Sequence, residues 1–174
     1  MGPLELRTLK GLVLSGCTDI MGYEALDFYD VDSLLTDEER MIRDAVRDWV
    51  DESVIPKIEN ACREGVFLDE WRQDIGSMGI LGAPLKGYGC PGLSYTAYGV
   101  ICRELERGDS GIRSFASVQG SLAMYPIWDF GSEDQKEKYL PRMATGELIG
   151  CFGLTEPDYG CLLYTSPSPR DKRQ

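Results

Sequence analysis

Apolar residues recur with a helical period over the segment that begins near residue 36. They stand three or four positions apart, as one face of an amphipathic helix requires, and they are Ile42, Ala45, Val46, Trp49 and Val50. Thr36 and Glu39 precede this stripe with the spacing of a capping box, in which each side chain bonds the backbone N–H group of the other. The pattern predicts a helix that begins at Thr36 and that bends or restarts at Pro56.

A second helix, a loop and a third helix are predicted next. The second helix has apolar residues spaced four and three apart, namely Trp71, Ile75 and Met78, and Gly79 stands where it would end. Residues 82–92 are rich in Gly and contain two Pro, which predicts a loop. Ser94 is a candidate cap for the third helix, whose apolar side carries Tyr98, Ile101, Cys102 and Leu105.

Two further helices are predicted before residue 146. One runs from about residue 110 to residue 125 and should end near Pro126, because Pro lacks the N–H group that a helix needs. Ser132 and Gln135 then form a second capping box, which predicts a helix over residues 133–144. The chain is therefore expected to be mainly α-helical up to this point.

The pattern changes after Gly150. Residues 151–155 are apolar and compatible with a β-strand, and residues 156–160 have the composition of a turn. From residue 161 the chain is basic and rich in Ser and Pro, and it matches neither a helix nor a strand. We interpret residues 161–174 as a non-native tail and residues 1–26, which show no sustained period, as a poorly ordered leader.

Composition narrows the function classes without identifying one. The formal net charge of -11 argues against a nucleic-acid partner, because phosphate binding needs clustered Lys and Arg. The absence of His excludes Ser-His and Cys-His nucleophile pairs and the commonest zinc ligand, and we predict no metal site. The six Cys residues lack a C-x-x-C pair and suit reduced thiols in a cytosol-like compartment. No stretch approaches the ~20 apolar residues that span a bilayer, so we expect no membrane association.

Two segments resemble the N-terminal half of acyl-CoA dehydrogenases. Residues 103–119 read RELERGDSGIRSFASVQ, and residues 131–157 read GSEDQKEKYLPRMATGELIGCFGLTEP. The phrase KGYGC at residues 86–90, taken with Arg113 and Ser114, resembles the glutaryl-CoA dehydrogenase branch in particular. The resemblance covers about residues 27–160 and rests on the order and spacing of these motifs together.

The resemblance implies a subunit with an N-terminal helical domain, a middle β-domain and a C-terminal helical bundle. FAD would lie between the β-domain and the bundle, and four subunits would assemble as a homotetramer. The substrate would be an acyl-CoA, oxidised by removal of the α-proton and transfer of the β-hydrogen as hydride to the flavin, with electron-transfer flavoprotein as the acceptor. In the glutaryl branch, decarboxylation to crotonyl-CoA follows. The catalytic Glu of the family lies in the C-terminal bundle, so the resemblance places no catalytic residue in this chain.

The resemblance also assigns residues to the flavin. The segment that would line the cofactor is Phe152, Gly153, Leu154, Thr155, Glu156, Pro157, Asp158, Tyr159 and Gly160. Backbone N–H groups and a Thr hydroxyl can bond the heteroatoms of a flavin ring, and Gly permits close approach of the backbone. Spacing alone favours an ordinary strand followed by a Pro-bearing turn, and the flavin role rests on the resemblance.

By this resemblance, Arg113 and Ser114 occupy the position at which glutaryl-CoA dehydrogenases contact substrate. Ser117 is a further candidate, because it lies four residues after Arg113 and would share that face of a helix. A guanidinium can hold a carboxylate with two parallel hydrogen bonds, which would select a dicarboxylic acyl chain. The alternative is a structural ion pair of Arg113 with Glu106 or Asp109, which are close in sequence.

We therefore expect a mainly α protein: an acyl-CoA dehydrogenase N-terminal helical domain at residues 27–147, followed at residues 148–160 by the first strand of the middle β-domain. By itself the chain should neither retain FAD nor turn over an acyl-CoA. Its compartment would be the bacterial cytoplasm or the mitochondrial matrix. The alternatives are another short-chain acyl-CoA dehydrogenase, an acyl-CoA oxidase, or a helical interaction module without a ligand.

Overall fold

The computed structural model describes residues 28–155 and divides into two units, residues 1–34 and residues 35–174. In the first unit, the described residues form the short 3-10 helix η1 (Val31–Leu34), and Ser33 N donates to Asp30 O at 3.0 Å. The predicted leader at 1–26, the turn at 156–160 and the tail at 161–174 lie outside the described residues.

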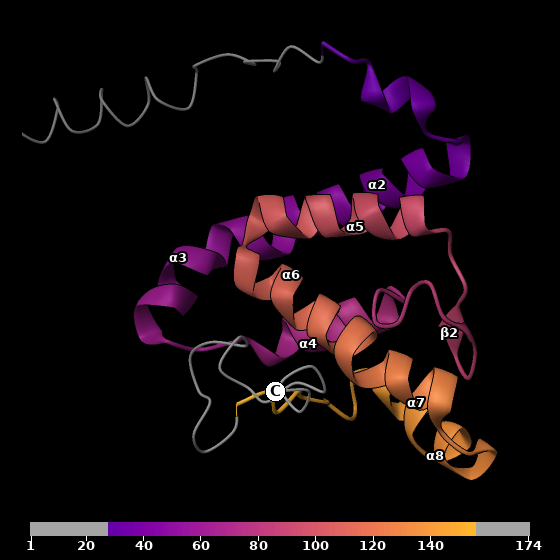
Figure 1. Cartoon of the computed structure of the whole chain (residues 1–174). Helices are drawn as coiled ribbons and strands as arrows, with labels where there is room; N and C mark the ends of the chain where they lie inside the picture. Colours follow the sequence, from indigo (N-terminus) through magenta and orange to yellow (C-terminus); the bar gives the residue numbers. More distant parts are fainter. Residues whose placement is uncertain (1–27, 156–174) are drawn as a thin grey trace, which may run out of the picture. The chain divides into compact units, whose positions relative to one another are not determined.

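The second unit is mainly helical, as the sequence predicts (Figure 1). Its elements in chain order are α2 (Asp37–Trp49), η2 (Val50–Val54), α3 (Ile55–Glu64), α4 (Asp69–Ser77), β1 (Lys86–Gly87), β2 (Cys90–Pro91), α5 (Tyr95–Gly108), α6 (Ser110–Ser117), η3 (Val118–Met124), α7 (Tyr125–Phe130) and α8 (Glu133–Ala144). The segments η2 and η3 are π-helices. Within residues 28–155, no helix is both long enough and apolar enough to cross a membrane.

Side-chain caps fix where the helices begin. Thr36 Oγ1 accepts a hydrogen bond from Glu39 N at 3.2 Å, and Glu39 Oε2 accepts one from Thr36 N at 3.0 Å. Ser132 and Gln135 make the same reciprocal pair at the start of α8. Ser94 Oγ caps α5 by accepting from Ala97 N at 3.0 Å. All three predicted helix starts are therefore confirmed, because the bonds that cap a helix are local.

The predicted helix end near Pro126 is wrong. The helix of residues 110–125 continues through η3 into α7, with Pro126 in the first turn of α7. Immediately before the proline, Tyr125 N donates to Gly120 O five residues earlier, which is the wide turn of a π-helix. A proline ring clashes with the carbonyl four residues before it, and a widened turn moves that carbonyl aside. Pro56 follows the π-helix η2 in the same way, in the first turn of α3, and the helical segment continues past it, so the predicted restart does not occur.

Two predictions about extended structure need correction. The loop at residues 82–92 contains a small antiparallel hairpin in which Lys86 pairs with Pro91 and Gly87 with Cys90. The strand expected at residues 151–155 is not formed among the described residues. A strand is stabilised by a hydrogen-bonded neighbour, and the two strands of the described chain pair only with each other.

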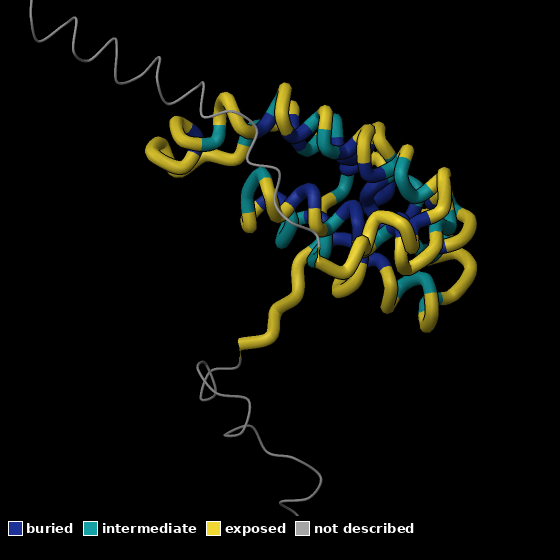
Figure 2. Tube along the Cα trace, turned by 90° about the horizontal axis from the view of Figure 1, so that it is seen from above, coloured by how far each residue is buried: buried dark blue, intermediate teal, exposed yellow. Residues whose placement is uncertain are grey.

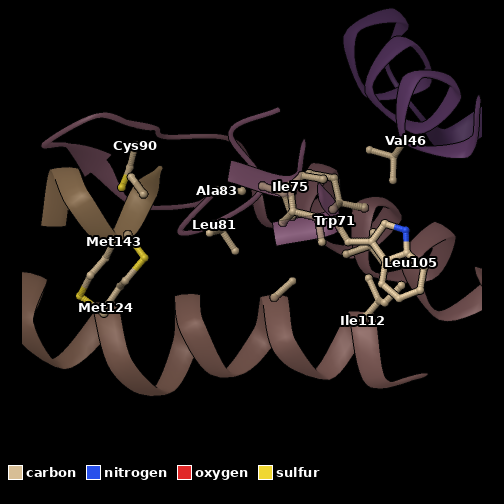
Figure 3. Packing of buried hydrophobic residues seen from close by; sticks show 14 of the residues in the cluster. Val46, Trp71, Ile75, Leu81, Ala83, Cys90, Leu105, Ile112, Met124 and Met143 are labelled. Carbon is tan, nitrogen blue, oxygen red and sulfur yellow. The ribbon is translucent and has the colours of Figure 1, made fainter. Parts of the chain in front are cut away.

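The core lies where α2, α4, α5, α6 and α8 meet (Figures 2 and 3). Helix α5 packs against α2 and against α6, the helix that follows it in the chain (Figure 1). Trp71 is 1% exposed, and its Nε1 donates to Ser53 O at 3.0 Å, so the burial of its ring leaves no polar atom unpaired. Trp49 and Trp128 pack against the same cluster. All three tryptophans have the packing role that the sequence analysis gave them.

Candidate functional site

Asp109 forms the junction between α5 and α6. It ends α5 and caps α6, and its Oδ1 accepts hydrogen bonds from Gly111 N at 2.8 Å and from Ile112 N at 3.1 Å. This cap turns the chain so that α6 packs back against α5. The side chain of Asp109 thus serves the backbone, and it forms no ion pair with Arg113 among the described residues.

Arg113 lies on the half-exposed face of α6 and is held by two side chains. Its Nε donates to Glu106 Oε2 at 2.6 Å, and its Nη1 lies 3.4 Å from Ser117 Oγ. Glu106 Oε1 also accepts from Ser110 Oγ at 2.5 Å. The bond from Arg113 and then that from Ser110 lower the pKa of Glu106, and the same ion pair raises the pKa of Arg113. Both groups are therefore ionised at neutral pH.

The geometry leaves part of the guanidinium open. The Arg113 side chain is 37% exposed, and its Nη2 has no hydrogen-bond partner among residues 28–155. The ion pair with Glu106 is the structural role that the sequence left as an alternative, while Ser117 stands beside Arg113 as the substrate hypothesis requires. Ser114 is half-buried, and its carbonyl accepts from Ser117 Oγ at 3.1 Å, so Ser114 supports the site through Ser117.

Three further side chains extend this face, and the sequence analysis did not assign them to it: Tyr98, Cys102 and Ser121. The hydroxyl oxygens of Tyr98 and Ser121 are 3.5 Å apart. Burial raises the pKa of Tyr98 and that of the Cys102 thiol, and the charge of Arg113 acts on both groups in the opposite direction. Helical spacing could have revealed them, because Tyr98, Cys102 and Glu106 are four residues apart on α5, and Arg113, Ser117 and Ser121 are four apart on the facing segment.

The predicted flavin segment follows α8 and faces solvent. Phe152 and Leu154 are 55% and 53% exposed. A Cβ atom added to Gly153 would meet no atom within 4 Å. Among the described residues, the backbone hydrogen bond of this segment is the one from Leu154 N to Phe152 O, at 3.1 Å. Thr155 is the last described residue, so Glu156, Pro157, Asp158, Tyr159 and Gly160 lie outside the described residues.

A groove borders the start of this segment. It has a volume of about 380 Å³ and is lined by η3, α7, α8 and residues 148–151. A separate apolar hollow of about 470 Å³ is lined by α2, by Ile101 of α5 and by Met78, Ile80, Pro91 and Leu93, and it contains none of the predicted site residues. The Tyr88 loop is held by α7 and α8, because Tyr88 Oη donates to Glu133 Oε1 at 2.5 Å and Trp128 Nε1 donates to Lys86 O at 2.9 Å. That loop is therefore not part of the Arg113 face.

Comparison with known proteins gives consistent matches. The sequence model of a family described as "Acyl-CoA dehydrogenase, N-terminal domain" matches residues 36–147. A crystal structure of a glutaryl-CoA dehydrogenase from Mycobacterium smegmatis in complex with FADH2 is 50% identical, with a TM-score of 0.74, over 78% of this chain and 35% of that one. Butyryl-CoA dehydrogenase from Megasphaera elsdenii is 32% identical, with a TM-score of 0.67, over 78% of this chain and 35% of that one.

A probable acyl-CoA dehydrogenase of Bacillus subtilis is 33% identical over 129 residues, which are 72% of this chain and 33% of that protein. The chain thus spans about a third of the length of the relatives that it matches. The matched family domain covers the helices from α2 to α8, which are the elements that carry the Arg113 face. The sequence match and the fold agree, and this chain belongs to the acyl-CoA dehydrogenase family, whose N-terminal domain it contains.

Proposed function

We propose that this chain is the N-terminal helical part of a FAD-dependent acyl-CoA dehydrogenase that oxidises glutaryl-CoA. The identity of 50% to a glutaryl-CoA dehydrogenase, against 32% to a butyryl-CoA dehydrogenase over the same share of the chain, supports this branch of the family. The observation that carries the proposal is the geometry of Arg113, whose guanidinium is oriented by Glu106 and Ser117 and keeps one nitrogen open.

In this proposal, Arg113 binds the distal carboxylate of the glutaryl chain. Glu106 occupies Nε, so the carboxylate would be held through the Nη atoms, and Ser117 Oγ, which accepts from Nη1, would orient the guanidinium. The positive charge is local, which reconciles the binding of an anionic substrate with a net charge of -11. Ser114 keeps Ser117 in place through its carbonyl.

The described part of the flavin segment fits a flavin ring. Phe152 and Leu154 expose apolar surface, and the space at Gly153 allows a planar group to approach the backbone. We propose that residues 152–160 line FAD, with Thr155 as an additional hydrogen-bond donor. When bound, FAD supplies a two-electron acceptor for the hydride that leaves the β-carbon of the substrate. The base that takes the α-proton would be a Glu in a part of the enzyme beyond this chain, with loss of CO2 following oxidation.

The complete enzyme would be a homotetramer of the bacterial cytoplasm or the mitochondrial matrix, and it would pass its electrons to electron-transfer flavoprotein. This chain alone would hold neither FAD nor a positioned base. Without the base it would lose the ~10²–10⁴-fold that general-base catalysis contributes. Absorbance of flavin in the purified 174-residue chain, together with turnover of glutaryl-CoA, would contradict this part of the proposal.

The substrate is tested with Arg113→Gln in the complete enzyme. Two charge-assisted hydrogen bonds are worth roughly 1.5–3 kcal/mol each, so at about 1.4 kcal/mol per tenfold we expect kcat/KM for glutaryl-CoA to fall by about two to four orders of magnitude. The value for butyryl-CoA should be unchanged or higher, because its alkyl chain has no distal carboxylate for the guanidinium to bind.

The matched control is Arg142→Gln. Arg142 lies in the last turn of α8 and pairs with Glu147 at 2.7 Å on the surface, so the same substitution there should leave both substrates unaffected. Equal losses on glutaryl-CoA and butyryl-CoA in Arg113→Gln would show that Arg113 is only a structural ion pair. Faster turnover of butyryl-CoA by the unmodified enzyme would indicate another short-chain acyl-CoA dehydrogenase, and reduction of O2 would indicate an acyl-CoA oxidase.

A further inference from the structure

Gln119 is a buried polar residue whose hydrogen bonds all go to one distant backbone segment. It lies in the first turn of η3 and is 1% exposed. Its Nε2 donates to Met143 O at 3.1 Å and to Leu148 O at 2.7 Å, and its Oε1 accepts from Gly150 N at 2.8 Å. Two carbonyl groups on one side of the amide and an N–H group on the other fix its orientation.

The backbone at Gly150 lies directly on η3. A Cβ atom added there would overlap the Cβ of Ala123 and would come within 3.0 Å of Met143 Cε. No side chain larger than hydrogen fits without a shift of one of the two segments. Gln119 and Gly150 therefore form one contact. It holds the chain that follows α8 against η3, two residues before Phe152.

Gln119 and the proposed substrate residue Arg113 belong to the same helical segment. Helix α6 runs without a break into η3, so Arg113 and Ser117 precede Gln119 by six and two residues on one continuous helical segment. A single side chain thus joins the helix that presents Arg113 to the base of the segment that contains Phe152.

We propose that Gln119 is a positioning residue, which holds residues 148–150 against η3 and thereby sets the place of residues 152–155 relative to Arg113. This inference rests on the proposed flavin role of residues 152–155. Hydride transfer is sensitive to displacements of well under 1 Å between the two reacting partners. Gln119 would supply a fixed distance between the element that binds the substrate carboxylate and the element that lines the flavin.

A merely structural role is the competing explanation, since buried carbonyl groups require hydrogen-bond partners in any protein. The two explanations differ in where the protein loosens when Gln119 is changed. A positioning contact opens locally at Gly150, whereas a general packing residue lowers the protection of all core amides together.

The test is amide hydrogen exchange, followed by NMR in the 174-residue chain, of Gly150 and of Leu105, a core residue of α5. Gln119→Met keeps the size of the side chain and removes all three hydrogen bonds. We expect the protection factor of Gly150 to fall at least tenfold more than that of Leu105. The control Ile112→Val loosens the buried face of α6 and leaves the three hydrogen bonds of Gln119 in place, and it should lower the two protection factors by the same ratio.

Gln119→Glu adds a readout that packing alone cannot produce. A protonated carboxyl group can donate to Leu148 O, while the carboxylate form repels both carbonyl groups. Burial raises the pKa of such a group, so the Gly150 protection factor of this variant should be near that of the unmodified chain at low pH and fall as pH rises. Gln119→Met should show no such change relative to the unmodified chain.

The inference is overturned if Gln119→Met lowers the protection of Gly150 and Leu105 equally, or if Gln119→Glu lacks the pH profile. In the complete flavin-loaded enzyme, Gln119→Met should also shift the visible absorption band of the flavin. Local opening at Gly150 with an unshifted flavin band would leave the contact established and would remove the proposed flavin role of residues 152–155. The two proposals can therefore fail separately.

Discussion

The buried carboxylate of Glu104 offers a stability experiment with a sharp expectation. Its side chain is 1% exposed in α5 and accepts hydrogen bonds from three arginines. Arg47 donates from Nε and Nη2, both at 3.0 Å, and Arg107 donates from Nε at 3.0 Å. Burial acts to raise the pKa of Glu104, but the bonds from Arg47 and Arg107 outweigh it and lower the pKa overall.

The informative substitution is Glu104→Gln, which keeps the shape and removes the charge. Its amide group would point an N–H donor at an arginine N–H donor, and an unsatisfied buried donor costs about 1–3 kcal/mol. The larger penalty of about 3–5 kcal/mol for a stranded buried charge is not expected, because the Arg47, Arg103 and Arg107 side chains are 37–45% exposed and can be hydrated. We expect the free energy of unfolding to fall by about 1–3 kcal/mol.

The control is Glu106→Gln on the same helix. The Glu106 side chain is 46% exposed, and exposed ion pairs contribute about 0–1 kcal/mol. Urea unfolding of the 174-residue chain, followed by circular dichroism, gives both values. Equal losses in the two variants at pH 7 would refute the reasoning from burial.

The pH dependence provides a second check on Glu104. A carboxyl group whose pKa is lowered in the folded state stabilises the fold above the unfolded pKa, about 4.3, and loses this contribution as pH falls through the folded pKa. The gap in stability between the unmodified chain and Glu104→Gln should therefore be constant above about pH 5 and shrink below the unfolded pKa. A gap that stays constant down to pH 3 would contradict the lowered pKa.

Two further predictions concern caps and thiols. Thr36→Ala should lower the free energy of unfolding by about 0.5–2 kcal/mol, because it removes the capping box of α2. Thr96→Ala, at an exposed position of α5, should change it by less than about 0.5 kcal/mol. Similar values for the two variants in urea unfolding would contradict the role of the cap. Burial raises the pKa of the Cys90 thiol to about 11. At pH 8, iodoacetamide should therefore alkylate exposed Cys62 well before Cys90. Equal alkylation rates, measured by peptide mass spectrometry, would contradict the burial of Cys90.

The sequence by itself determined the features whose physical cause is local. The starts of α2, α5 and α8 follow from Thr36, Ser94 and Ser132, since a cap bonds N–H groups two or three residues away. The apolar stripes placed Ile101 and Leu105 in the core for the same reason, because helical periodicity is a property of neighbouring residues. The family was also readable from the order of short motifs.

Tertiary structure alone decided the features that depend on distant partners. Gln119 bonds carbonyl and N–H groups that lie 24–31 residues away, and no local pattern marks it as different from any other helical Gln. The helix passes Pro126 because a π turn makes room for the proline ring, and nothing in the spacing of apolar residues announces that turn. Residues 151–155 have the composition of a strand, but β-structure is made by a neighbour as much as by the segment itself, and the described chain supplies none.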